Sequence, residues 1–380
     1  MVLVLMCVVW PTQLHAQESS IGPFQIRDEA GHTLRVTGFA QLLAQVNGKE
    51  SQYDNTILRV RRLRPGLSAS LGHGLEFDAI WDLAPGSGQL IDAVATLDVK
   101  SHVKLQLGQF KTPWSRYRLT SGSDQVLVNW SHTTAYFGGE RQLGLAVSRS
   151  DQSQGRLHYH LGVFSGNNAR SSHGIGLAKV YKQPVENTSL FGKSSVSRDV
   201  HPELVGHVGV GSQGMDVARL DDPSGGGLRA YVGIGATHDF QPEAMYDADS
   251  RAQAEVIIKW SGFSTYTGVY AQRNALQQDD GRYGVMYGGL FESTYHVGTR
   301  TSLGIRASRM KLSDALLQDA RLVSASSEVW HQLDEFALGA RYQVLGENLV
   351  LTSDLGLNQA YVEDARQNSW RVRLQTQLSF

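Results

Sequence analysis

The sequence predicts an all-β protein, and more narrowly a membrane-spanning antiparallel β-barrel of about 16 strands. Apolar and polar residues alternate with a two-residue period from about Leu34 to the last residue, which is the period of a β-strand. The alternating runs number sixteen, and their connections alternate between short turns and longer segments. Bacterial outer-membrane barrels have both features, since short turns join their strands on one side and longer loops on the other.

Composition excludes several other classes. The 380 residues carry 35 Lys and Arg against 36 Asp and Glu, so no basic excess points to a nucleic-acid partner. Disorder is excluded because 41% of the residues are hydrophobic. Cys7 is the single cysteine, which excludes a disulfide scaffold and a cysteine-ligated metal site.

The first residues have the pattern of an export signal. Met1–Trp10 is uninterrupted apolar sequence, and the small-residue triplet Leu14-His15-Ala16 follows shortly, as at a signal-peptide cleavage site. We therefore expect a signal peptide over 1–16, a short N-terminal periplasmic segment over 17–33 and the transmembrane β-barrel over 34–380. A buried N-terminal strand is the alternative, because no Lys or Arg precedes the apolar run.

Individual strands follow from which residues share a face. Near the C-terminus Trp370, Val372 and Leu374 alternate with Arg371 and Arg373, because successive side chains of a strand point to opposite faces. The same pattern predicts strands near 34–47, 56–71, 74–83, 90–99, 102–110, 141–150, 156–165, 203–212, 227–240, 251–261, 263–273, 283–296, 298–310, 331–344, 348–359 and 368–380.

One face of these strands is expected to contact the lipid bilayer. Lipid offers no hydrogen-bond partners, so a spanning sheet has to close on itself. Aromatic residues near the ends of the runs, such as Trp81 and Trp260, would form the interfacial girdles. Phe380 ends the last strand, and we expect the barrel-assembly machinery to recognise it. A secreted soluble β-protein would also show alternation and is the alternative.

Segment 111–140 is about thirty residues without a regular period, and loops of that length are usually functional or disordered. Its five aromatic residues favour packing over disorder. We expect it to be the third external loop, folded into the pore as a constriction, with Lys111, Arg116 and Arg118 facing the water path. The alternative is an external loop whose cations are merely solvated.

The polar faces of the strands predict what lines the interior. They carry twelve cations and ten acids; five of the acids lie on the third and fourth strands, and seven of the cations on strands thirteen, fourteen, sixteen and two. This distribution predicts a basic wall and an acidic wall. Arginine suits phosphate because its planar group can hold two oxygens at once. The candidate pore-lining and anion-binding residues are Arg62, Arg64, Lys104, Lys111, Arg116, Arg118, Arg371 and Arg373.

Several segments resemble the phosphate-selective porin family, porins O and P. The sharpest match is Gly108-Gln109-Phe110-Lys111-Thr112-Pro113-Trp114, which is similar to the family's segment that ends a strand and opens the long third loop. Further matches, in order, are Arg61-Arg62-Leu63-Arg64-Pro65-Gly66-Leu67, Asp82-Leu83-Ala84, Asp92-Ala93, Arg141-Gln142-Leu143-Gly144-Leu145 and Gly162-Val163-Phe164-Ser165-Gly166-Asn167. The resemblance implies a trimeric outer-membrane channel for passive anion uptake, with its third loop folded into the pore.

The expected function is therefore passive diffusion of small anions through the outer membrane of a Gram-negative bacterium, with phosphate or polyphosphate as the leading candidate. Phosphate-specific members of the family carry a denser ladder of pore arginines, so a general non-specific porin is an alternative. An outer-membrane barrel enzyme, a hydrolase or protease, is the rival class, and a non-conducting adhesin or scaffold is a third. The expected partners are small anionic solutes, the lipid bilayer and further copies of the chain in a homotrimer.

Two weaker motifs carry no functional prediction. His158 and His160 share a strand face, but no third ligand is nearby in sequence, so we expect no metal and no cofactor. Gly209, Gly211 and Gly214 have the spacing of a dinucleotide-binding motif, yet no helix follows them, and we interpret the stretch as a turn.

Overall fold

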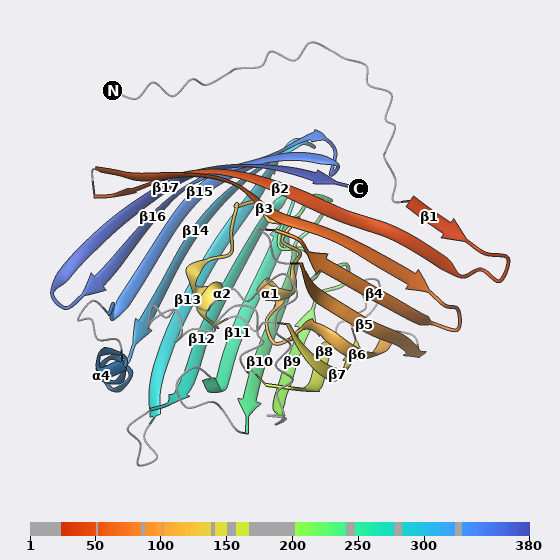
Figure 1. Ribbon diagram of the computed structural model, residues 1–380, viewed down its shortest axis with the longest axis horizontal. Coiled ribbons are helices and arrows are strands. Elements are labelled where there is room, and N and C mark those ends of the chain that lie inside the picture. Colours follow the sequence, from red (N-terminus) through yellow and green to blue (C-terminus); the bar gives the residue numbers. More distant parts are fainter. Residues whose placement is uncertain are drawn as a thin grey trace, which may run out of the picture.

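The computed structural model describes residues 24–50, 52–84, 88–100, 102–137, 141–149, 157–166, 202–240, 248–276, 283–323 and 329–380. Over these residues, strands β2 to β17 form an antiparallel ring of sixteen, in which each strand pairs with the next along the chain (Figure 1). The ring closes where β17 pairs with β2. A short additional strand, β1, pairs with the first residues of β2.

The sixteen strands of the ring vary in length between 8 and 19 residues, and β1 has four. Their bounds are β1 (Phe24–Arg27), β2 (Thr33–Lys49), β3 (Gln52–Ser70), β4 (Leu75–Asp82), β5 (Gln89–Lys100), β6 (Val103–Lys111), β7 (Arg141–Arg149), β8 (Leu157–Phe164), β9 (Glu203–Gly211), β10 (Arg229–Asp239), β11 (Ala248–Trp260), β12 (Phe263–Ala275), β13 (Tyr283–Val297), β14 (Thr301–Leu312), β15 (Gln332–Leu345), β16 (Leu349–Val362) and β17 (Ala365–Ser379).

The described residues of the connections include the short helices α1 (Arg116–Leu119), α2 (His132–Phe137) and α4 (Asp314–Val323). No helix in the described ranges has the length and apolar character needed to cross a bilayer.

The closed ring confirms the predicted antiparallel β-barrel of about 16 strands, and each of the sixteen predicted runs corresponds to one of β2 to β17. The predicted segment 17–33 contains the strand β1, which the sequence pattern did not indicate. The predicted signal peptide, 1–16, lies outside the described residues.

The two faces of the sheet differ as the alternation predicts. On β10, Val232 and Ile234 are exposed on the outside, whereas Tyr231 and Thr237 are buried on the inside. On β17, Arg371 and Arg373 are likewise buried on the inner face. The exposed apolar face is what a strand presents to lipid, and the polar inner face is what lines a barrel interior.

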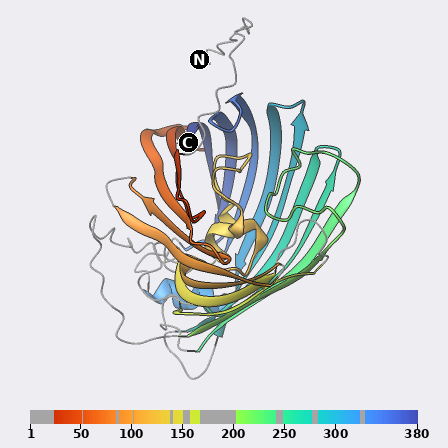
Figure 2. The same cartoon turned by 90° about the vertical axis from the view of Figure 1, so that its right-hand side faces the viewer.

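The residues between β6 and β7, 112–137, lie inside the ring of strands together with α1 and α2 (Figures 1 and 2). Glycines on the inner wall make room for them. A Cβ atom on Gly235 of β10 would lie 2.0 Å from the carbonyl oxygen of Trp114, and one on Gly288 of β13 would lie 2.5 Å from Phe137 Cε2. Both distances are too short for real contacts. The segment therefore packs so closely on these two glycines that a larger side chain at either position would collide with it.

Candidate functional site

Carboxylates on four different strands hold the 112–137 segment against the inner wall. Backbone N–H groups and one hydroxyl of the segment donate to them, and these hydrogen bonds replace water for groups that are buried. Arg116 N–H donates to Glu255 of β11 at 3.2 Å, Tyr117 Oη–H to Glu292 of β13 at 2.5 Å, Val128 N–H to Asp354 of β16 at 2.9 Å and His132 N–H to Glu335 of β15 at 2.8 Å.

Arginines from strands one or two positions away in the sheet neutralise three of these carboxylates. Their N–O distances lie between 2.5 and 2.7 Å in the pairs Arg306–Glu292, Arg371–Glu335 and Arg373–Asp354. The predicted basic wall is therefore wrong on this side of the ring, because the register places an acid beside each of these arginines. Arg371 and Arg373, two of the candidate pore-lining residues, serve here to balance the carboxylates that hold the segment.

The imidazole ring of His132 also contacts side chains of the same wall. Its Nε2 atom is 3.1 Å from Asn358 Oδ1 and 3.3 Å from Arg371 Nη1. Burial, together with the charge of Arg371, lowers the pKa of His132 below its usual value, although Glu335 acts in the opposite direction. Within the same segment, burial raises the pKa of Tyr136 to about 12.

A β-bulge on β3 turns an additional arginine inward. Gln41 of β2 pairs with Arg62, but the next residue, Leu42, pairs with Val60, so Arg61 is the extra residue. Arg61 donates to the carbonyl oxygen of Val128 and to Gln375 Oε1, and Arg62 Nη1 donates to Gln41 Oε1 at 2.9 Å. Strict alternation predicts that Arg61 points to lipid, which is why the sequence reasoning missed it.

The root of the 112–137 segment carries a basic cluster, which we define as Arg61, Arg62, Arg64, Lys111 and Arg141. Arg64 pairs with Asp82 of β4 and Arg141 with Asp92 of β5, each at 2.8 Å. These pairs neutralise two of the acids in the acidic wall that the sequence predicts on β4 and β5. Arg61, Arg62 and Lys111 instead donate to uncharged oxygens, so none of these hydrogen bonds pairs the cation with a carboxylate. Lys111 Nζ donates to the carbonyls of Leu119 and Thr120 at 3.2 and 3.0 Å.

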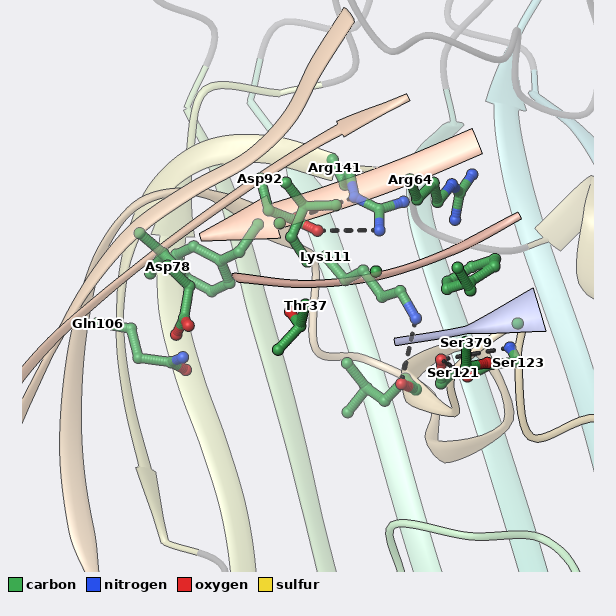
Figure 3. A pocket seen from close by; sticks show the side chains of 18 of the residues that line it. Thr37, Arg64, Asp78, Asp92, Gln106, Lys111, Ser121, Ser123, Arg141 and Ser379 are labelled. Carbon is green, nitrogen blue, oxygen red and sulfur yellow. Dashed lines mark hydrogen bonds and ion pairs between the residues drawn. The ribbon is translucent and has the colours of Figure 1, made fainter. Parts of the chain in front are cut away.

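A cavity of about 640 Å³ lies beside this cluster, and Arg64, Lys111 and Arg141 line it. Figure 3 shows Arg141 reaching Asp92 and Lys111 reaching toward the 112–137 segment. The remaining lining residues are Thr37, Gly38, Phe39, Gly66, Asp78, Ile80, Asp92, Val94, Gln106, Phe110, Pro113, Leu119, Ser121, Gly122, Ser123, His160, Ser379 and Phe380. The cavity thus touches the inner faces of β2 to β8 and the 112–137 segment, and it combines several cations with two acids.

The other predicted cations are distributed differently. Arg118 lies with its guanidinium carbon 5.2 Å from the Trp130 ring centre, and its charge acts on both Arg62 and Lys111. Arg116 is buried and faces the opposite wall, 5.8 Å from the ring centre of Tyr231.

Lys104 also lies away from the basic cluster, at the other end of β6. It is half-exposed beside the β5–β6 turn, where Nζ is 3.6 Å from Asp98 Oδ1. Lys111 is seven positions further along the same strand, and at about 3.3 Å per residue the two lie roughly 23 Å apart. Lys104 therefore does not belong to the basic cluster. The alternation of the sequence predicts which face of a strand a residue is on, but not which residues of other strands lie at the same level of the barrel.

The histidines on β8 do not form a metal centre with other residues of the described chain. His158 and His160 are both buried on the inner face, and the His160 and His207 ring centres are 6.2 Å apart. Among the described residues no group of three or more His, Cys, Asp or Glu side chains could hold a metal ion.

Comparison with known proteins agrees with this architecture. The outer membrane channel DcaP of Acinetobacter baumannii has a TM-score of 0.62 at 12% identity, covering 93% of this chain and 99% of that one. OprB of Pseudomonas putida has a TM-score of 0.60 at 12% identity, covering 91% and 94%. An anion-selective porin from Comamonas acidovorans has a TM-score of 0.57 at 11% identity, covering 92% and 100%. At these identities the likeness concerns the fold.

No curated protein matches the chain significantly. The model of the family described as phosphate-selective porin O and P matches residues 32–216. This range includes β2 to β9, the 112–137 segment and the whole basic cluster. The match confirms, over residues 32–216, the resemblance to this family that is seen in the sequence.

Proposed function

We propose that the chain is a porin in the outer membrane of a Gram-negative bacterium, through which small anions diffuse passively, with phosphate as the leading candidate. The 112–137 segment is, in this proposal, the third external loop, and it narrows the water path. The observation that carries the proposal is the basic cluster at the root of this segment, beside an open cavity. Fixed cations at a narrow level replace part of the hydration that an anion loses there.

Arg61 and Arg62 are the residues most suited to this role. Each is hydrogen-bonded to neutral oxygens, and each lies close enough to the other cations to feel their repulsion. An anion that enters relieves this repulsion. Arginine forks can moreover hold two oxygens of one anion, which favours phosphate over a spherical ion.

A general anion-permeable porin without phosphate specificity is the second candidate. It is favoured by the ion pairs Arg64–Asp82 and Arg141–Asp92, which occupy two arginines of the cluster with fixed carboxylates. An anion would have to compete with those carboxylates, so the affinity for phosphate would be low. Both candidates are channels rather than enzymes, and neither requires a catalytic residue or a cofactor.

Planar-bilayer recording of the purified protein tests both candidates. In a potassium chloride gradient we expect a reversal potential of the sign set by chloride. Phosphate added afterwards should reduce the chloride current if the cluster prefers phosphate, and should leave it unchanged if the pore is general. A reversal potential of the sign set by potassium would refute both.

Assembly is part of the proposal. We propose a homotrimer, as the family resemblance implies, and export by a cleaved signal peptide over 1–16. Phe380 would be recognised by the barrel-assembly machinery: its main chain exchanges hydrogen bonds with Gly38 of β2 at 2.9 and 3.0 Å, while its side chain is 44% exposed. Chemical cross-linking of the purified protein in detergent tests the trimer, and deletion of Phe380 should lower the amount of assembled barrel.

A further inference from the structure

The connection between β9 and β10, residues 212–228, is unusual for its end of the barrel. Neighbouring strands are antiparallel, so the β9–β10, β11–β12, β13–β14 and β15–β16 connections all lie at the end where β17 reaches Phe380. The last three have two or three residues each, whereas 212–228 has seventeen. The 112–137 segment begins at the opposite end, because it follows β6.

The 212–228 segment folds inward and is fixed to the inner wall. Lys259 of β11 donates from Nζ to the carbonyls of Asp216 and Arg219 at 2.8 and 2.9 Å. Ser264 of β12 donates to the carbonyl of Leu220, and His296 of β13 lies 3.2 Å from Asp221. These side chains are buried on the inner face of the sheet or nearly so. The segment is therefore held at a fixed place inside the ring.

The segment also reaches across the ring to the 112–137 segment. Arg219 Nη1 lies 3.8 Å from Glu347 in the β15–β16 turn, and Arg219 interacts electrostatically with Asp124. Glu347 pairs in turn with Arg341, whose Nη2 donates to the carbonyl of Ser123 at 3.5 Å. The two inner segments, which enter from opposite ends, thus meet at one level beside β15 and β16.

We propose that the 212–228 segment forms a second constriction of the pore, and that this constriction rather than the basic cluster limits the conductance. The inference rests on the proposed channel function. The 212–228 segment, whose backbone carbonyls bind the inner wall, extends from β10 to the β15–β16 turn. It therefore covers part of the cross-section of the barrel at the level of that turn. Sequence resemblance gave no sign of it, because the glycine-rich stretch that opens it has the pattern of an ordinary turn.

The charge at this level differs from that of the basic cluster. The acids Asp124, Asp216, Asp221, Asp222 and Glu347 face the cations Arg219, Arg229, Lys259 and Arg341, and most of them are joined by ion pairs or by backbone hydrogen bonds. The second constriction is therefore nearly neutral with a slight acidic excess. It restricts passage by size and adds no preference for anions, whereas the basic cluster selects them.

Replacement of residues 214–228 by Asn-Gly tests the proposal, because a two-residue turn can join β9 to β10 directly. We expect the single-channel conductance to rise at least about twofold while the reversal potential keeps its sign, since a wider exit lowers resistance and leaves the selecting charges in place. Unchanged conductance in a folded variant would overturn the inference. If the natural chain does not conduct at all, the proposed function itself fails, so the two failures are distinguishable.

A milder variant covers the case in which the shortened barrel does not fold. Arg219→Cys in a Cys7→Ser background gives a single thiol, because Cys7 is the only cysteine of the sequence. Reaction with a charged thiosulfonate reagent should reduce the current, and a negative adduct should reduce the chloride current more than a positive one. Arg309→Cys, on an exposed side chain toward the far end of β14, is the matched control and should change the current little. Complete labelling of Arg219→Cys without a change in current, or failure to label it, would contradict a constriction there.

Discussion

Asp354 of β16 and Arg373 of β17 form a two-point ion pair, with both N–O distances at 2.7 Å. The same carboxylate accepts the backbone N–H of Val128 at 2.9 Å, from a residue 226 positions away in the sequence. One side chain thus joins two strands and the 112–137 segment. The relationship explains why charged side chains predicted to line a pore are used in part to hold the 112–137 segment on the inner wall.

Asp354→Asn should destabilise the barrel by about 3–5 kcal/mol, because it leaves the buried charge of Arg373 without its partner. Both side chains of the pair are at most 4% exposed, so water cannot compensate. The free energy of unfolding in denaturant, measured in detergent micelles, checks this. Asp98→Asn is the matched control: its partner Lys104 is 46% exposed, and loss of that surface pair should cost less than about 1 kcal/mol. Equal losses for the two variants would contradict the anchoring role of Asp354.

Gly288→Ala should displace the 112–137 segment, because the new methyl group would lie 2.5 Å from Phe137 Cε2. We expect a loss of about 1–3 kcal/mol in unfolding free energy and a changed single-channel conductance. Gly289→Ala, one position along the same strand, meets nothing within 4 Å and should behave like the natural protein. If both variants keep the natural conductance and stability, the segment does not pack on β13 as described.

Stability should fall as the pH drops below about 6.5, the usual pKa of histidine. The lowered pKa of His132 in the folded protein means that the unfolded chain binds this proton more readily. Stability is therefore full above the unfolded value and is lost as the pH falls toward the lower folded value. Unfolding midpoints measured between pH 7.5 and pH 5 check this, with His132→Gln as comparison. A pH dependence that is the same in His132→Gln would assign the effect to other groups.

The period-two alternation was sufficient to predict the strands, since it follows from the geometry of any strand with lipid on one side. Trp370 to Arg373 illustrate this: the apolar residues face out and the arginines are buried inside. The pairing of β17 with β2 follows from the same requirement, because a barrel in lipid cannot leave an edge.

The contents of the interior could not be predicted in the same way. Arg61 faces inward because of a bulge, and a bulge shifts the alternation by one residue without a signal of its own in the sequence. Pairs such as Arg371–Glu335 depend on the register between strands, which alternation leaves open. The 212–228 segment was missed because its inward course is fixed by Lys259 and Ser264, which lie far along the chain.

The most direct test of the central claim, that the basic cluster selects anions, compares the natural protein with the triple variant Arg61→Gln, Arg62→Gln and Arg64→Gln in a potassium chloride gradient. We predict a chloride-type reversal potential for the natural protein and a shift toward zero or beyond for the triple variant. Lys104→Gln, which removes a cation from the far end of β6, should leave the reversal potential unchanged. A triple variant as anion-selective as the natural protein, or a natural protein selective for potassium, would contradict the account.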